Sequence, residues 1–161
     1  MPNESFIKGL DAAAVRILKD KGLVLTTAES CTGGMVSSLI VNISGASNVF
    51  KEGFVTYCDE AKEKLLGVSH ETMLKYKAVS AEVASEMAKG ACKKAKADVA
   101  VSITGVAGPS MEDGKPVGLV YIACHYKDET IVKEFNFTGD RKSVREQAAF
   151  NALKLVIDTV K

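Results

Sequence analysis

The chain has 161 residues, 47% hydrophobic and 25% charged, which is typical of a single globular domain (1–161) with a sizeable core. Its 21 basic and 20 acidic residues leave a net charge of +1 and form no basic block, which argues against a nucleic-acid partner. The longest apolar runs, such as 119–124, are too short to span a bilayer, so no membrane partner is expected. The first 22 residues are charged and amphipathic, unlike a signal peptide, so the expected location is cytoplasmic.

In chain order, the first expected element is a helix over 5–21 that stops at Gly22. Its apolar face comprises Ile7, Leu10, Ala14, Ile17 and Leu18. A short β-rich strand at 23–27 and a helix at 35–41 follow. Polar residues suited to capping mark the starts of the later helices, namely Asp59 (for a helix over 60–66), Ser69, Ser80 and Asp140.

Further strands are expected at 53–57, 99–103, 117–125 and 131–137. The stretch 117–125 is nearly all apolar, which favours a central position in the sheet. The turn at 127–129 joins it to the next strand as a hairpin, so the sheet contains antiparallel pairing. The sequence therefore predicts an α/β fold with three layers (α/β/α) and a mixed sheet of about five strands.

The stretch Ala28-Glu29-Ser30-Cys31-Thr32-Gly33-Gly34 lies between the first expected strand and the following helix. A helix start exposes unpaired N–H groups, and the two glycines leave them open to approach. A hydroxyl at this position suits two roles. Ser30 is either a nucleophile beside an oxyanion hole or an additional donor to a bound anion such as phosphate.

Three loops follow strands and are expected to meet at one edge of the sheet, because sites in open α/β sheets form at the carboxyl ends of strands. These loops are the Ser30 turn, residues 57–62 and residues 104–109.

A nucleophilic serine needs a base. His70 and His125 are poorly placed for a triad or a metal site, whereas Lys62 lies on a short helix just before the apolar Leu65 and Leu66. Burial and the first helical turn both disfavour its charge, and a pKa of about 7.5 requires roughly 4 kcal/mol of such destabilisation. The alternative is a surface lysine whose stem alone is buried.

The four cysteines, at positions 31, 58, 92 and 124, include no Cys-x-x-Cys pair, so neither a disulfide framework nor a metal site is expected. Cys31 is the one candidate for a reactive thiol, because a helix start lowers the pKa of a thiol.

Several stretches, in order along nearly the whole chain, resemble the CinA carboxy-terminal domain family, whose enzymatic members are nicotinamide-nucleotide amidases (NMN deamidases). They are 28–34, 53–57, 60–62, 65–68, 78–80, 104–109 and 115–118. The resemblance implies hydrolysis of the carboxamide of nicotinamide mononucleotide to nicotinate mononucleotide and ammonia. It implies no cofactor, a small-molecule nucleotide as partner, and a homo-oligomer.

By the same resemblance Ser30 is the nucleophile and Lys62 its base, with Tyr57 assisting by bonding the lysine or relaying its proton. The N–H groups near 32–34 are expected to hold the oxyanion. The expected substrate-binding residues are Glu29, which orients the turn or a substrate hydroxyl, Thr32, Gly33, Gly34, Thr104 and Gly105. Arg141 and Arg145 are expected at the phosphate, because a positive charge at a helix start is unfavourable unless an anion faces it.

Two stretches depart from the family pattern. Cys58-Asp59 replaces the common Ser-Asn, and a carboxylate three residues before Lys62 favours the charged amine. Residues 110–114 replace a slightly longer Gly-Gly-Thr insert, and only the amidase-like part of the longer relatives is expected here. Two alternatives stay open, namely a non-catalytic nucleotide- or phosphate-binding module on the same fold and an amidase with a shifted substrate.

Overall fold

A five-stranded mixed sheet runs through the middle of the molecule, in the computed structural model, which describes residues 9–161. Its strand order is β2-β1-β3-β4-β5. The first three of these strands run parallel to one another, whereas β4 and β5 are antiparallel to their neighbours. The bounds are β1 Leu25–Glu29, β2 Phe50–Val55, β3 Val99–Gly105, β4 Leu119–Tyr126 and β5 Glu129–Asn136.

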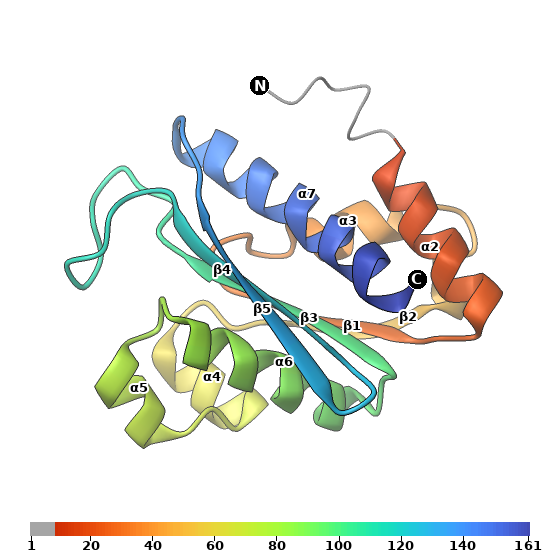
Figure 1. The fold of residues 1–161 in the computed structure, drawn as a ribbon, viewed down its shortest axis with the longest axis horizontal. Helices are drawn as coiled ribbons and strands as arrows, with labels where there is room; N and C mark the ends of the chain where they lie inside the picture. Colours follow the sequence, from red (N-terminus) through yellow and green to blue (C-terminus); the bar gives the residue numbers. More distant parts are fainter. Residues whose placement is uncertain (1–8) are drawn as a thin grey trace.

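Helices cover both faces of this sheet, which confirms the predicted three-layer α/β/α arrangement (Figure 1). One face carries α2 Leu10–Lys21, α3 Met35–Val41 and α7 Arg141–Val160. The other carries α4 Asp59–Leu66, α5 His70–Tyr76 and α6 Ala81–Ala95. A short 3-10 turn, η1 Ala46–Asn48, precedes β2. The expected start of the first helix, with Ile7, lies outside the described residues. Among those described, no helix is long and apolar enough to cross a membrane.

The strands differ from the sequence expectation in where they begin and end. The first strand ends at Glu29 rather than residue 27, because its pairing with β3 continues as far as Glu29 opposite Ile103. The apolar 117–125 stretch forms β4, which is an interior strand as expected, paired with β3 on one side and β5 on the other, although β3 holds the middle position. The apolar sequence of β4 reflects its packing against α6 on one face and α7 on the other.

Side-chain caps begin three of the helices where the sequence predicts them. Ser69 Oγ accepts from the Thr72 N–H, Ser80 Oγ from the Val83 N–H, and Asp140 Oδ1 from the Ser143 N–H. The prediction that Asp59 caps α4 was wrong. Cys58 is the residue with extended backbone before that helix, and Asp59 is its first helical residue.

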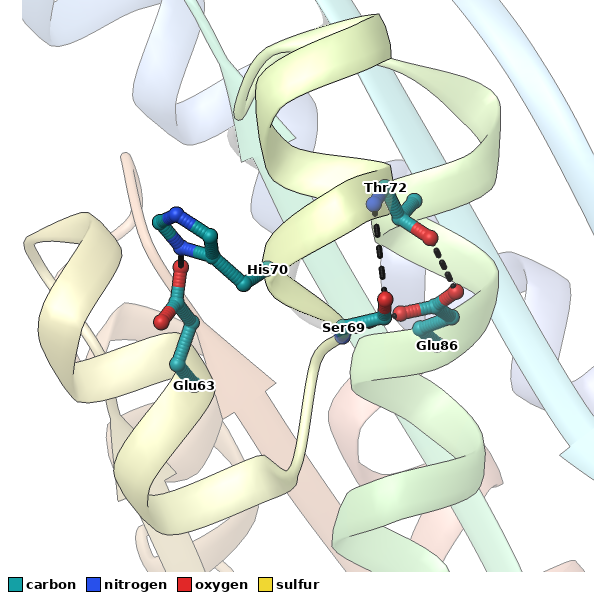
Figure 2. Close-up of polar contacts among 5 residues, drawn as sticks. All are labelled: Glu63, Ser69, His70, Thr72 and Glu86. Atoms are coloured by element: carbon teal, nitrogen blue, oxygen red, sulfur yellow. Dashed lines mark hydrogen bonds and ion pairs between the residues drawn. The ribbon is translucent and has the colours of Figure 1, made fainter.

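Polar contacts hold α4 and α5 in place beside α6 (Figure 2). Glu63 of α4 bonds His70 of α5, with 2.9 Å between Oε1 and Nδ1. Glu86 of α6 accepts from the Ser69 N–H and from the Thr72 hydroxyl, both at 2.7 Å. The helix that carries Lys62 is therefore tied to its neighbours away from the sheet.

Candidate functional site

A cavity of about 300 Å³ lies at the carboxyl ends of the parallel strands, where the sequence predicts that three loops converge. All three loops contribute to its wall, and so do residues before α6, residues 110–112 and Arg141 at the start of α7. The lining residues are Ser30, Cys31, Tyr57, Asp59, Lys62, Ala78, Val79, Arg141 and residues 104–112.

Lys62 and Ser30 meet in this cavity. The Lys62 side chain is 2% exposed, and its Nζ lies 3.0 Å from Ser30 Oγ and 2.9 Å from the Thr56 carbonyl oxygen. The prediction that Lys62 points inward is confirmed. The companion residue Leu65 does not share that face, because it is 40% exposed while Leu66 is buried.

Two opposing influences act on the charge of Lys62. Burial lowers the pKa of its amine below the ordinary value of 10.5, because an ammonium loses its hydration in the interior. The nearby Asp59 carboxylate is the largest influence that raises this pKa, followed by Cys58 and Glu112. The effect of burial is the larger, so at a given pH a greater fraction of the Lys62 amine is neutral than in an exposed lysine.

Glu29 is fully buried and fixes the turn that carries Ser30. Its Oε1 accepts from the Thr32 hydroxyl at 2.7 Å and the Val36 N–H at 2.8 Å. Its Oε2 accepts from the Ser37 N–H at 3.1 Å and the Ser37 hydroxyl at 2.7 Å. The carboxylate thus takes two N–H groups at the start of α3, which has no side-chain cap of its own. Two roles were expected for Glu29, namely orienting the turn or binding a substrate hydroxyl. All four of these contacts lie within the turn and the start of α3, so they fit the first role.

Thr32, Gly33 and Gly34 form the turn but do not line the cavity. The Thr32 side chain is buried against Glu29, and the Gly33 N–H donates to the Ser30 carbonyl oxygen at 3.0 Å. Gly34 precedes α3 with a φ of 101°, a backbone conformation that favours glycine. The Gly33 N–H is therefore already engaged within the turn.

Tyr57 and Arg141 bond each other across the cavity mouth. The Tyr57 hydroxyl accepts from Arg141 Nη2 at 2.6 Å, and Arg141 Nη1 donates to the Gly108 carbonyl oxygen. Among the described contacts, Tyr57 makes no hydrogen bond to Lys62, whose second partner is the Thr56 main-chain oxygen instead. The Tyr57 ring is 58% exposed and so faces the entrance.

The two arginines expected at a phosphate lie in different places. Arg141 lines the cavity, whereas Arg145 lies beside it and holds the turn after Ser30. Arg145 Nε donates to the Cys31 carbonyl oxygen and Nη2 to that of Thr32, both at 2.9 Å. Thr104 and Gly105 line the cavity as expected, but as the last residues of β3 rather than part of a loop.

Cys31 does not have the lowered thiol pKa expected at a helix start. Burial raises its pKa to about 12, which keeps the thiol protonated and unreactive. All four cysteines are free. Within residues 9–161, no group of three histidines, cysteines or carboxylates could hold a metal ion, and neither histidine lines the cavity.

Sequence reasoning missed part of the cavity wall and one residue that anchors Lys62. Met111 and Glu112 line it, although the loop that carries them was noted only as a departure from the family pattern. Thr56, which anchors Lys62 through its carbonyl oxygen, was also missed. A main-chain acceptor exists at every residue, so the sequence carries no sign of it.

The fold and the cavity together define the class of protein. It is a mixed-sheet α/β protein in which a buried lysine contacts a serine at the carboxyl ends of parallel strands. The chain belongs to the CinA C-terminal domain family, whose model matches residues 7–160.

Relatives and solved structures agree with this assignment. A CinA-like protein of Kosmotoga olearia is 49% identical over 150 residues, which are 92% of this chain and 36% of that protein. A CinA superfamily structure from Escherichia coli has a TM-score of 0.94 and 39% identity, covering 99% of this chain and 94% of that one. The competence/damage inducible protein CihA from Agrobacterium tumefaciens has a TM-score of 0.94 and 35% identity, covering 100% and 98%. The chain spans little more than a third of the length of the curated relatives it matches.

Proposed function

We propose that this chain is an amidase that hydrolyses the carboxamide of nicotinamide mononucleotide through Ser30 and Lys62. The observation that carries the proposal is the 3.0 Å contact between the buried Lys62 Nζ and Ser30 Oγ in the cavity. A base within hydrogen-bond reach of a hydroxyl, with its pKa lowered by burial, is what activation of a serine requires. The identity of the substrate comes from the family resemblance.

In the proposed first half-reaction, neutral Lys62 takes the Ser30 proton as Oγ forms a bond to the amide carbon. The carbonyl oxygen becomes an oxyanion held by main-chain N–H groups of the turn. When the C–N bond breaks, the Lys62 ammonium gives its proton to the departing nitrogen, which leaves as ammonia. An ester between Ser30 and the nicotinate group remains.

In the second half-reaction, water attacks the ester carbon while Lys62 accepts a proton from it. The bond to Ser30 Oγ breaks, Ser30 regains its proton from Lys62, and nicotinate mononucleotide leaves. The cavity of about 300 Å³ is at the small end of ligand sites, so it suits the nicotinamide ring. The exposed Arg141 at the mouth then supplies a cation for the phosphate.

The test is ammonia release from nicotinamide mononucleotide by the purified chain. We expect Ser30→Ala and Lys62→Ala each to abolish release without unfolding the protein, and the exposed Ser38→Ala on α3 to leave it unchanged. Normal turnover in Lys62→Ala would mean that another group is the base. Binding without ammonia release would indicate a nucleotide-binding module, and release only from other amides would indicate a shifted substrate.

A further inference from the structure

The guanidinium of Arg145 reaches from α7 to the turn that carries Ser30. It donates one hydrogen bond to the Cys31 carbonyl oxygen and one to that of Thr32, each at 2.9 Å. Hydrogen bonds from a charged donor are stronger than neutral ones, and two bonds from one planar group fix orientation as well as distance. Arg145 therefore sets the orientation of two consecutive peptide groups directly after Ser30.

The direction of these carbonyl groups decides where the N–H groups point, because the N–H of a planar trans peptide points opposite to its C=O. The Thr32 and Gly33 N–H groups therefore both point away from Arg145. The Gly33 N–H meets the Ser30 carbonyl oxygen, so this direction leads back toward residue 30. The Thr32 N–H points to the same side, and it has no hydrogen-bond partner among residues 9–161.

The positive charge of Arg145 also strengthens this donor. No carboxylate in the described part of the chain forms an ion pair with Arg145, whose partners are carbonyl oxygens. A cation bonded to a peptide oxygen polarises that peptide, because hydrogen bonds in a chain reinforce one another. The N–H of the peptide between Cys31 and Thr32 is thus made a better donor to negative charge.

We propose that Arg145 is a positioning residue that presents the Thr32 N–H to the oxyanion formed when Ser30 attacks the amide carbon. The proposal rests on the proposed amidase function and deepens it. Arg145 does not line the cavity, so it acts through the turn rather than on the substrate. This role replaces the one expected from the sequence, in which Arg145 binds the phosphate.

Two measurements on Arg145→Gln and Arg145→Lys test this role. The first is the kcat and KM of ammonia release. The second is the rate at which a fluorophosphonate probe labels Ser30, followed by intact mass. In that reaction Ser30 Oγ bonds to phosphorus, its proton passes to Lys62 and fluoride leaves, so it needs an oxyanion donor but no particular amide. Lys142→Gln is the matched control, because it removes an 80% exposed charge from the same helix.

We expect kcat and the labelling rate of Arg145→Gln to fall by about 10²–10³-fold, the effect of losing one oxyanion donor, with KM unchanged. Arg145→Lys should recover part of the loss, because it keeps the charge but lacks the planar fork. Lys142→Gln should behave as the wild type. Near-ultraviolet circular dichroism checks folding, and if Arg145→Gln does not fold, Arg145→Lys carries the comparison.

Three outcomes would overturn the proposal. They are unchanged kcat and labelling in a folded Arg145 variant, a raised KM with unchanged kcat, which would indicate substrate binding, and wild-type protein whose Ser30 is not labelled at all. A wild type that is labelled but releases no ammonia would contradict the amidase function alone. In that case the labelling rates of the variants still decide the role of Arg145.

Discussion

Lys62 and Asp59 face the same cavity from one short helix and act against each other. The amine must be neutral to accept the Ser30 proton, and burial lowers its pKa toward that state. The Asp59 carboxylate raises the same pKa by stabilising the ammonium. In the proposed mechanism, the balance between these two influences on the pKa of Lys62 sets the pH range in which it can accept the Ser30 proton.

We expect Asp59→Asn to move the pH profile of kcat/KM toward lower pH. Because the carboxylate raises the pKa of Lys62, its removal lowers that pKa, and kcat/KM begins to rise with pH earlier than in the wild type. Below the wild-type inflection the variant should therefore be faster. Initial rates of ammonia release across the pH range measure this shift.

The matched control for that shift is Glu60→Gln. Glu60 is another acid in the first turn of α4, but it is not among the groups that shift the pKa of Lys62. Its profile should overlay that of the wild type. A profile of Asp59→Asn displaced to higher pH would contradict the assignment of Lys62 as the base.

The candidate base could be predicted from the sequence, but its surroundings could not. Lys62 follows from helical spacing, because it is one turn before the buried Leu66. The contacts of Arg145 join positions 114 and 113 apart, and those of Tyr57 with Arg141 join positions 84 apart. Proximity in the chain suggested Lys62 as the partner of the Tyr57 hydroxyl, whereas α7 supplies it from the other side of the fold.

The packing of α4 on α6 depends on Gly90. A Cβ atom there would lie 1.8 Å from the Leu66 carbonyl oxygen and 2.8 Å from its carbon. These are main-chain atoms, which cannot move aside as a flexible side chain does. The absence of a side chain at Gly90 therefore lets α4, the helix that carries Lys62, pack closely against α6.

We expect Gly90→Ala to lower the free energy of unfolding by about 1–3 kcal/mol, as in other overpacked cores. This loss exceeds the gain of about 0.5–1 kcal/mol that alanine brings to a helix interior. Urea unfolding measures the change, and ammonia release should fall as well because α4 is displaced. Gly9→Ala is the control, since a Cβ there meets nothing within 4 Å. Equal unfolding midpoints for the two variants would contradict this explanation.

Elements set by local contacts could be predicted, and those set by distant partners could not. The helix starts at Ser69, Ser80 and Asp140 depend on a side chain and an N–H three residues later, so the sequence contains both partners. The ends of β1 and the order of β3 and β4 depend on strand pairing. Apolar composition indicates only that a strand is buried, not which position it takes.

The buried Lys62 affects the whole molecule through its stability. In the unfolded chain its amine keeps its proton up to the ordinary pKa of 10.5, whereas in the folded protein the pKa is lower. Between these two values the unfolded state binds more protons, so the free energy of unfolding rises with pH. At pH values below the lowered pKa, protonation of this buried group costs the folded state stability.

We expect Lys62→Met to lose this dependence. The stability of the wild type relative to Lys62→Met should increase with pH as 10.5 is approached from below. Urea unfolding of both proteins at several pH values gives the difference. Lys64→Met changes an exposed position of the same helix, so its free energy of unfolding should depend on pH as that of the wild type does. A Lys62→Met difference that is constant with pH would mean that folding does not shift the pKa of the Lys62 amine.

Because α7 follows all five strands in the sequence, Arg141 and Arg145 are translated long after Ser30. A ribosome adds about 5–20 residues each second, so roughly 6–23 seconds separate the emergence of Ser30 from that of Arg145. During that interval the growing chain contains Ser30 and, after 32 further residues, Lys62, but it lacks the Arg145 guanidinium that bonds the Cys31 and Thr32 carbonyl oxygens. Under the proposed amidase function, we therefore expect a growing chain to reach full activity only after α7 has been translated and has packed onto the sheet.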